Sequence, residues 1–583
     1  MKMVNLKING IDVCAPEGST ILEAARLAGI SIPTLCYLKE INEIGACRIC
    51  VVEVKGARSL MASCVYPISE GMEVFTNTKR IHQSRKTTLE LILSAHNKNC
   101  LSCPRNGSCE LQTLCSEFGV DELNKYEGEM PQRIVDSSAP HLVRDNTKCV
   151  LCRRCEAVCR EQKVGVIGVN ARGFDTHMGC AFEKDLWDVS CIACGQCATV
   201  CPTGAIVEKD QCDDVIRALH DPEKYVVVNT APAIRATLGE CFGLPIGTNV
   251  KGKMVAALRR IGFNKVFDTN FGADLTIVEE ANEFLDRVKN GGTLPMITSC
   301  SPGWVKFCEH YYPELIDNLS SCKSPQQMTG AIIKTWFAQK EGIDPKNIVV
   351  VSVMPCTAKK FETTRDDQAA SGFADTDVSI TTRELAKLIR RSSVDFNLLP
   401  DEEFDSILGE SSGAATIFGA TGGVMEAALR TAADILEEKS LDNLDYHEIR
   451  GMKDTKEATY HIAGMDIRVA VVSGLKNASI LLDKVKNGKA DYHFIEVMCC
   501  PGGCVNGGGQ PIQSAAVRNF TDFREKRAKA LYEEDKNLPI RKSHENKAIK
   551  KLYDEFLVKP GSHKAHEILH TTYIKREKYY KEK

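Results

Sequence analysis

The sequence predicts a multidomain protein of mixed α/β and α+β class, in which small cysteine-bearing domains precede a larger α/β domain. Three observations support this prediction. The chain has 583 residues, enough for about four domains. Cysteines are concentrated before residue 202, and beyond Asp221-Pro222 apolar runs alternate with amphipathic stretches. We expect the segments 1–79, 80–125, 126–209, 210–523 and 524–583.

Composition and charge exclude several classes of protein. The net charge of −3 and the pI near 6.5 give no basis for a nucleic-acid partner. No run of about 18 apolar residues occurs, so no membrane span is predicted. The first residues alternate like a strand and lack the apolar core of a signal peptide, which favours a cytoplasmic protein. The 27 cysteines recur as C-x2-C, which favours metal ligands over disulfides.

The first segment, 1–79, is expected to be a β-rich domain of β-grasp type. Val4–Val13 predicts two strands that turn at Asn9-Gly10, a strong hairpin signal. A short helix is predicted to follow over Ile21–Leu27. This pattern resembles that of small ferredoxin-like domains and sets the context for the cysteines that follow.

Four cysteines in this segment have the spacing C-x10-C-x2-C-x13-C: Cys36, Cys47, Cys50 and Cys64. Four thiolates with one close pair suit a [2Fe–2S] cluster, with a longer first gap than the plant-type pattern. A zinc site uses similar ligands and is the alternative. The strand pattern before the cysteines favours iron–sulfur.

The segment 80–125 is expected to be helical around cysteine-bearing loops. It contains the spacing H-x3-C-x2-C-x5-C, formed by His96, Cys100, Cys103 and Cys109. Three cysteines leave a [4Fe–4S] cluster one ligand short, and His96 is the local candidate. An imidazole in place of a thiolate should favour the reduced cluster. Cys115 is the rival fourth ligand, although the sequence predicts that it lies on a helix.

A duplicated motif in 140–209 is the strongest signal in the chain. C-x2-C-x2-C-x3-C occurs twice, as in bacterial two-cluster ferredoxins, where the fourth cysteine of each run binds the other cluster. One [4Fe–4S] cluster is therefore assigned Cys149, Cys152, Cys155 and Cys201, and the second Cys191, Cys194, Cys197 and Cys159. The remaining cysteines without ligand spacing are expected to pack in the core: Cys14, Cys115, Cys180, Cys212, Cys241, Cys308 and Cys322.

The segment 210–523 is expected to alternate strands and helices. The predicted strands are Tyr225–Asn229, Leu294–Ile297, Ile348–Val353 and Val469–Val472. The charged tail, 524–583, is expected to form a solvated helical wrap without a binding function.

Three cysteine-bearing loops in this segment, 298–304, 354–362 and 496–511, resemble the signature loops of [FeFe] hydrogenases. The flanking stretches 267–274 and 417–423 strengthen the resemblance, and the order of the N-terminal clusters is similar to that of the large clostridial-type members. The resemblance implies reversible reduction of protons to H2. It also implies an α/β catalytic domain with the H-cluster between two lobes, fed by one [2Fe–2S] and three accessory [4Fe–4S] clusters.

The H-cluster of that family is a [4Fe–4S] unit joined to a diiron site with CO, cyanide and an azadithiolate bridge. Carried over residue by residue, the resemblance makes Cys356 and Cys500 ligands of this cubane and Cys504 its link to the diiron site. Lys359 would donate a hydrogen bond to a cyanide. The other faces of the diiron site would be lined by Met354, Met498, Ala231, Pro232 and Gln326. Independently, the run Gly502–Gly509 suits close approach of backbone to a bulky group.

A proton route is expected along one helix face. Glu280, Glu283 and Arg287 are spaced so that their side chains lie on the same side of a helix. Buried carboxylates have raised pKa values and can relay protons near neutral pH. By resemblance, Cys300, Glu280, Ser320 and Glu283 form this relay, with Arg287 at its mouth. The alternative to a proton relay is an ordinary helix face of Glu and Arg side chains exposed to solvent.

One position departs from the family pattern. The first loop usually ends in two adjacent cysteines, of which the second binds the cubane, but this chain has Cys300-Ser301. It also has Cys499 immediately before Cys500, where a small residue is usual. Cys499 could replace the missing thiolate, Cys300 could become the ligand, or Ser301 could bind through oxygen. Thiolate is the better ligand, which favours the first two.

The expected partners are a ferredoxin or flavodoxin, or a flavoprotein subunit that oxidises NAD(P)H, together with maturation proteins for the diiron site. Two other classes share parts of the pattern. The iron–sulfur subunit of respiratory complex I lacks the loops at Cys356 and Cys504, and iron–sulfur assembly factors lack the N-terminal [2Fe–2S] pattern. Ser301 keeps a weakly active or sensory hydrogenase-like protein as the alternative function.

Overall fold

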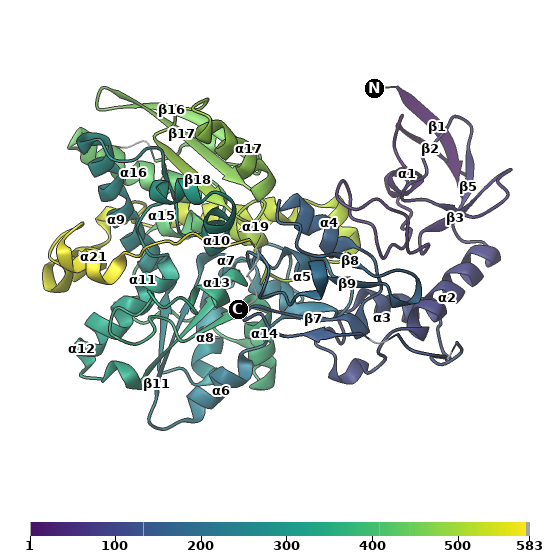
Figure 1. Cartoon of the computed structure of the whole chain (residues 1–583), viewed down its shortest axis with the longest axis horizontal. Helices are drawn as coiled ribbons and strands as arrows, with labels where there is room; N and C mark the ends of the chain where they lie inside the picture. Colours follow the sequence, from purple (N-terminus) through teal and green to yellow (C-terminus); the bar gives the residue numbers. More distant parts are fainter. Residues whose placement is uncertain (1, 127, 132, 407, 442–443, 579–583) are drawn as a thin grey trace.

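The computed structural model describes residues 2–126, 128–131, 133–406, 408–441 and 444–578. It is a multidomain α/β protein, with a small N-terminal sheet at one end of the molecule and the larger α/β part at the other (Figure 1). The N-terminal sheet has the order β2-β1-β5-β3-β4. Its strands are β1 (Met3–Ile8), β2 (Ile11–Pro16), β3 (Val51–Val54), β4 (Met61–Ala62) and β5 (Glu73–Phe75).

Local signals placed the N-terminal elements correctly. The hairpin between β1 and β2 turns at Asn9 and Gly10, which both have positive φ. Helix α1 (Ile21–Leu27) begins with a capping box, in which Thr20 and Glu23 satisfy each other's backbone N–H groups. The expectation that Cys14 packs in the core is wrong, because Cys14 lies on the outward face of β2 and is exposed.

The middle of the chain contains short elements that frame cysteine loops: α2 (Lys79–Ser94), α3 (Glu110–Glu117), α4 (Arg154–Glu161), α5 (Gln196–Val200), and strands β6 (Val135–Asp136), β7 (Leu142–Asp145), β8 (Gly168–Asn170), β9 (His177–Gly179) and β10 (Ile206–Glu208). The sequence repeat is also a backbone repeat. Leu151 and Arg153 have positive φ before α4, as Ala193 and Gly195 do before α5. Both cysteine loops therefore curl in the same way.

The large part contains two four-stranded sheets. One has the order β12-β11-β14-β15 and is parallel throughout; the other has the order β13-β18-β17-β16, with only the β16–β17 pair antiparallel. The strands are β11 (Tyr225–Thr230), β12 (Lys265–Asp268), β13 (Met296–Ile297), β14 (Ile348–Met354), β15 (Val378–Thr381), β16 (Thr455–Ile462), β17 (Met465–Ser473) and β18 (Phe494–Met498). The four strands expected here exist. The one expected over Leu294–Ile297 is shorter, since it begins only after Pro295, which cannot donate to a ladder.

Helix α9 (Thr269–Asn290) runs beside both sheets and is buried along most of its length. It carries Glu280, Glu283 and Arg287 on one side, as the spacing predicted. Within the part of the chain that the structure describes, no helix is both long and apolar enough to span a membrane.

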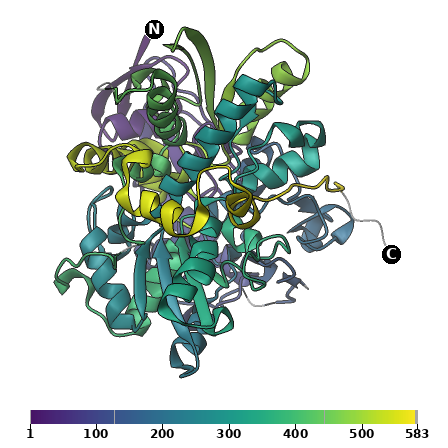
Figure 2. The same cartoon turned by 90° about the vertical axis from the view of Figure 1, so that its left-hand side faces the viewer.

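The C-terminal tail is not the solvated wrap that its charge suggested. Helices α19 (Phe523–Asn537), α20 (Lys547–Leu552) and α21 (His563–Leu569) lie against the large part of the molecule (Figures 1 and 2). Leu531, Leu552, Leu557 and Leu569 are fully buried, the last three in the core that α9 and α11 (Pro325–Ile332) share. The tail therefore completes the core around α9. Residues 579–583 of the tail lie outside the described residues.

Candidate functional site

A buried cavity lies where the carboxyl ends of four strands meet. Strands β11 and β14 of one sheet, and β13 and β18 of the other, each run directly into a segment that lines it. In open α/β sheets this edge is the usual place for ligands. The cavity has a volume of about 80 Å³, and its wall includes Ala231, Pro232, Cys300, Ser301, Gln326, Met354, Cys356, Lys359, Met498, Cys499, Cys500 and Cys504. These loops were predicted to converge, and the structure brings them together.

The sulfur atoms of this wall form a donor set that fits an iron–sulfur group. Cys356, Cys500 and Cys504 lie close enough for their charges to interact. Burial, with repulsion from Cys500, raises the pKa of Cys504 to about 12, while Lys359 acts in the opposite direction. Burial likewise raises the pKa of Cys356 far above its usual range. Thiols in such surroundings ionise when a cation joins them, which is how metal clusters are bound.

Lys359 is the cation in the cavity wall, and its position is fixed by several acceptors. Its ammonium donates to Ser324 Oγ at 2.6 Å, Glu362 Oε2 at 2.9 Å and the Cys300 carbonyl at 3.3 Å. The same Glu362 oxygen accepts from Gln326 Nε2 at 3.0 Å. A buried, paired lysine of this kind suits an anionic group in the cavity.

Glu280 of α9 is a buried carboxyl near Cys300. It is 1% exposed, and neither of its carboxyl oxygens has a hydrogen-bond partner among the described residues. Burial, with repulsion from Glu283, raises the pKa of Glu280 to about 8. Ser320 lies near enough to oppose this shift, although it donates its hydrogen bond elsewhere. Glu280 also interacts electrostatically with Cys300. A carboxyl group with this pKa can take up and release protons near neutral pH.

From Glu280 the polar groups continue outward in the predicted order. Ser320 Oγ donates to Glu283 Oε2 at 3.0 Å. Arg287 donates to the other Glu283 oxygen at 2.6 Å and to the Leu319 carbonyl at 2.8 Å. Glu283 and Arg287 are both partly exposed, so the chain of groups runs from the cavity towards solvent.

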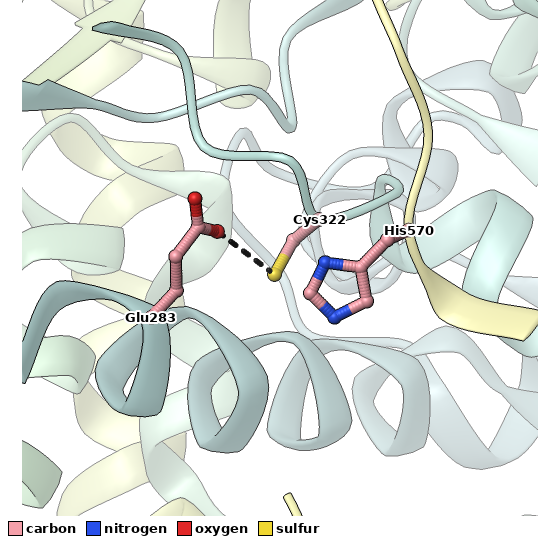
Figure 3. Close-up of side chains that lie close together, drawn as sticks. All are labelled: Glu283, Cys322 and His570. Atoms are coloured by element: carbon pink, nitrogen blue, oxygen red, sulfur yellow. Dashed lines mark hydrogen bonds between the residues drawn. The ribbon is translucent and has the colours of Figure 1, made fainter. Parts of the chain in front are cut away.

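A further cluster at the outer end of this chain has no sequence motif. Glu283, Cys322 and His570 point towards one another from α9, a loop and the end of α21, and Cys322 donates to Glu283 across 3.8 Å (Figure 3). His570 is bonded through Nδ1 to Ser321 Oγ at 2.8 Å and through Nε2 to Glu279 at 3.2 Å. Since every donor atom here already has a protein partner, the cluster is a hydrogen-bond network that anchors the tail beside α9.

Glycines allow the catalytic loops to approach the ferredoxin-like loops at backbone distance. A Cβ at Gly508 would lie 2.2 Å from the Cys194 carbonyl oxygen, and one at Gly195 would lie 2.2 Å from Thr357 Oγ1. Thr357 in turn donates to the Ala193 carbonyl at 2.7 Å. As a result Cys194, which belongs to the repeated motif, also lines the main cavity.

The two repeated cysteine runs enclose two smaller cavities, and the fourth cysteine of each run crosses to the other. Cys201 lines the cavity of the first run, with Cys149, Cys152 and Cys155. Cys159 lines the cavity of the second run, with Cys191, Cys194 and Cys197. This grouping is the one predicted from the ferredoxin spacing, while the metal-binding roles themselves stay predictions.

The N-terminal candidates also gather in two places. Cys50 and Cys64 are 3.3 Å apart, and Cys36 and Cys47 form a second contact beside them. Further along, the loops before α3 carry Cys103 and Cys109, and Cys100, which is exposed, begins a short 3-10 helix there.

His96 is buried near these loops, and its Nδ1 has no partner in the described part of the chain. Burial lowers the pKa of His96 to about 4, so its ring is neutral, the form that binds metals. Cys115 is partly buried on α3 and interacts with Cys109, so it stays a rival ligand.

Comparison with protein families matches five regions of the chain. Residues 224–508 match the iron only hydrogenase large subunit, C-terminal domain, and 521–576 the iron hydrogenase small subunit. The N-terminal matches are a 2Fe-2S iron-sulfur cluster binding domain (1–79), the NADH-ubiquinone oxidoreductase-G iron-sulfur binding region (85–123) and a 4Fe-4S binding domain (188–207).

Whole-chain similarity decides the family. The NADP-reducing hydrogenase subunit HndD of Solidesulfovibrio fructosivorans is 50% identical over 99% of this chain and 100% of that protein. Iron hydrogenase 1 of Clostridium pasteurianum is 44% identical over 98% of this chain and 100% of that protein. This chain is an [FeFe] hydrogenase.

Solved [FeFe] hydrogenase structures support the catalytic fold. A variant of HydA1 from Chlamydomonas reinhardtii is 40% identical with a TM-score of 0.56, covering 63% of this chain and 99% of that one. As an [FeFe] hydrogenase with additional iron–sulfur domains, the protein is an oxidoreductase. Iron–sulfur assembly factors are more distant: the one from Danio rerio is 32% identical over 61% of this chain. The complex I and assembly-factor alternatives, and the weakly active or sensory one, are not favoured.

Proposed function

We propose that this hydrogenase interconverts protons and H2 in the cavity between its two large sheets, with the H-cluster held by Cys356, Cys500 and Cys504. When bound, that cofactor supplies the iron centre at which protons and electrons combine. The observation that carries the proposal is the pairing of this thiol-lined cavity with Glu280, a buried carboxyl without a partner among the described residues. The test is hydrogen evolution by matured protein, together with infrared bands for CO and cyanide; their absence after competent maturation would exclude the cofactor.

The protein's own groups would hold and shield the cofactor. Lys359 would donate to an anionic diiron ligand in place of its longest contact, the Cys300 carbonyl at 3.3 Å, while Ser324 and Glu362 keep the ammonium in position. Met354 and Met498 would exclude water with adaptable apolar side chains. Ala231, Pro232 and Gln326 would close the remaining faces.

The proposed proton route starts at the Cys300 thiol and passes to Glu280, Ser320 and Glu283. Arg287 would stand at its mouth and hold Glu283 in the orientation that accepts from Ser320. Glu280, whose oxygens lack partners within the described chain, lies in the middle of this route. Because no hydrogen-bond donor occupies these oxygens, Glu280 can accept a proton from one neighbour in the route and pass it to the next.

The proposed electron route uses one [2Fe–2S] cluster and three accessory [4Fe–4S] clusters. The crossed cysteine groups would hold the last two, and Cys194 brings the nearer of them to the wall of the catalytic cavity. The [2Fe–2S] cluster would bind Cys36, Cys47, Cys50 and Cys64. The remaining one would bind His96, Cys100, Cys103 and Cys109. We propose that domain boundaries at residues 79, 125, 209 and 523 separate the three cluster-binding segments, the catalytic domain and the C-terminal tail.

We propose that the electron partner belongs to a multi-subunit complex linked to NAD(P). Two similarities support this: HndD is an NADP-reducing hydrogenase subunit, and residues 85–123 match a region of NADH-ubiquinone oxidoreductase. A flavoprotein subunit would then exchange electrons with this chain, and ferredoxin or flavodoxin is the alternative donor. Maturation proteins for the diiron site and a cytoplasmic location are part of the same proposal, since thiolate ligands need a reducing compartment.

The raised pKa of Glu280 predicts opposite pH responses in the two directions of turnover. Below about pH 8 this carboxyl is protonated and can give a proton to Cys300, so hydrogen evolution should fall as the pH rises through 8. Hydrogen uptake needs the ionised form as acceptor and should rise over the same range. Dye-linked assays of matured enzyme from about pH 6 to about 10 would measure both; an evolution rate that stays level to the upper end of this range would contradict the assignment.

Replacing His96 with cysteine should lower the reduction potential of its cluster by about 100 mV or more, because a thiolate adds negative charge beside the iron. The measurement is a potentiometric titration followed by EPR. Cys115→Ser is the matched control and should leave the titration unchanged. A shift in the Cys115 variant rather than the His96 variant would transfer the ligand role to Cys115.

A further inference from the structure

We infer that Cys499 supplies the fourth thiolate of the cubane half of the H-cluster, at the place where the family pattern has a cysteine and this chain has Ser301. The inference rests on the proposed function. It concerns a choice that sequence alone left open, since Cys300, Ser301 and Cys499 were all candidates. The positions of the cavity sulfur atoms now separate these three.

The cysteines of the cavity wall divide into two groups. The first is Cys300, whose thiol interacts with Glu280 of the relay, and also with Cys504 and Lys359, so that it links the relay to the second group. Cys356 and Cys504 both interact with Cys500. A cubane bound by four cysteines needs one more thiol beside this second group. If Cys300 turned away to complete it, the inner end of the relay would be lost.

Cys499 lies on the side of the second group. It directly follows β18, is 4% exposed, and its thiol interacts first with Cys194 and then with Cys500. It lines the same cavity as Cys356 and Cys504. The Cys499 thiol is therefore the remaining thiol of the cavity wall beside these neighbours that the proton relay does not use.

The start of α10 (Pro302–Tyr311) leaves room for this sulfur. A Cβ at Gly303 would lie 2.9 Å from Cys499 Sγ, closer than such atoms approach in folded proteins. Any side chain at position 303 would thus compete with the thiol for space. Gly303, two residues after Ser301, therefore provides the space that the Cys499 sulfur occupies.

Ser301 is already engaged in another way. Its hydroxyl oxygen accepts a hydrogen bond from the backbone N–H of Cys499 at 3.4 Å. This contact ties the first loop to the third and places the serine as a support for the segment that carries Cys499. A neutral hydroxyl is also a weaker ligand for iron–sulfur clusters than a thiolate. Ser301 is therefore a positioning residue, and Cys499 is the ligand.

The test uses the full chain produced without the diiron maturation proteins, so that only iron–sulfur clusters are present. Iron per chain and the EPR spectrum after dithionite reduction are measured for wild type, Cys499→Ala, Ser301→Ala and the double variant Ser301→Cys/Cys499→Ala. Cys308→Ala is the control, because Cys308 is a fully buried cysteine of α10 that bonds to the Tyr312 carbonyl and does not line the cavity.

We expect Cys499→Ala to lose about four iron atoms per chain, one cubane, while the signals of the accessory clusters persist and show that the chain is folded. After addition of a synthetic diiron complex, this variant should give no CO or cyanide bands. Ser301→Ala and Cys308→Ala should keep the full iron content. The double variant should regain it, because it restores a thiol at position 301.

Two results would overturn the inference. Full iron content in Cys499→Ala, with a change only in an accessory-cluster signal, would mean that Cys499 merely donates a hydrogen bond to Cys194. Loss of the cubane in Ser301→Ala would make the serine oxygen the ligand. Either result would leave the proposed hydrogenase function standing. A wild-type protein that binds the cubane but never turns over hydrogen would instead overturn the proposed function and leave the assignment of Cys499 standing.

Discussion

Glu280→Gln is expected to reduce hydrogen turnover at least about 100-fold in both directions, because glutamine cannot carry a proton between Cys300 and the outer groups. The substitution removes no bond that holds the fold, since the Glu280 oxygens have no hydrogen-bond partner in the described chain. It also removes a buried group whose ionisation is costly. The variant should therefore fold and mature normally, with wild-type iron content and infrared bands, and should fail in proton transfer alone.

The neighbouring residue offers a matched control for this variant. Glu279 is equally buried on α9, but it accepts hydrogen bonds from Tyr553 and His570 and faces the tail rather than the cavity. Glu279→Gln should keep most of the turnover even where it lowers stability. Wild-type turnover in Glu280→Gln, measured in the same hydrogen assays, would remove Glu280 from the route.

Arg235→Met is expected to lower the free energy of unfolding by about 3–5 kcal/mol, the usual effect of removing one partner from a buried ion pair. Arg235 is 1% exposed and bonds to Asp268 at 2.7 Å and to Glu534 at 3.0 Å. It thus joins helix α7 (Pro232–Arg235), which follows β11, to the N-cap residue of α9 and to the tail helix α19. Methionine would fill a similar volume but would leave the Asp268 carboxylate buried without a cation.

Calorimetry of the holoenzyme would register this loss as a fall of about 4–8 °C in the unfolding midpoint of the catalytic part. Arg260→Met is the control, because Arg260 pairs with Glu402 at the surface and its loss should cost about 1 kcal/mol or less. Equal midpoints for Arg235→Met and wild type would show that the buried pair contributes nothing net to stability.

Most elements of the fold were predictable because their causes are local. The Asn9-Gly10 turn and the Thr20 cap act within a few residues, and each cysteine run specifies its own loop. The tail was misjudged because burial depends on distant partners. Leu552 and Leu569 look like occasional apolar residues in a charged stretch until α9 and α11 are placed beside them.

In the candidate site, too, features with local causes were predictable from the sequence and contacts between distant residues were not. Motif spacing gave the cysteine groups and the helix face that bears Glu280, since both follow from regular geometry. It could not give the contact between Ser321 and His570, which are 249 residues apart with no pattern to connect them. Nor could it choose among Cys300, Ser301 and Cys499, because that choice depends on which way each side chain points across the cavity.

The close approach of Gly508 to the backbone of Cys194, and of Gly195 to the side chain of Thr357, has a consequence for building chimaeras. Neither contact tolerates an added Cβ, and each pairs a residue of the ferredoxin-like loops with one of the catalytic loops. Accessory domains from another hydrogenase would therefore seat correctly only if the graft keeps glycine at position 195 and the catalytic part keeps glycine at position 508.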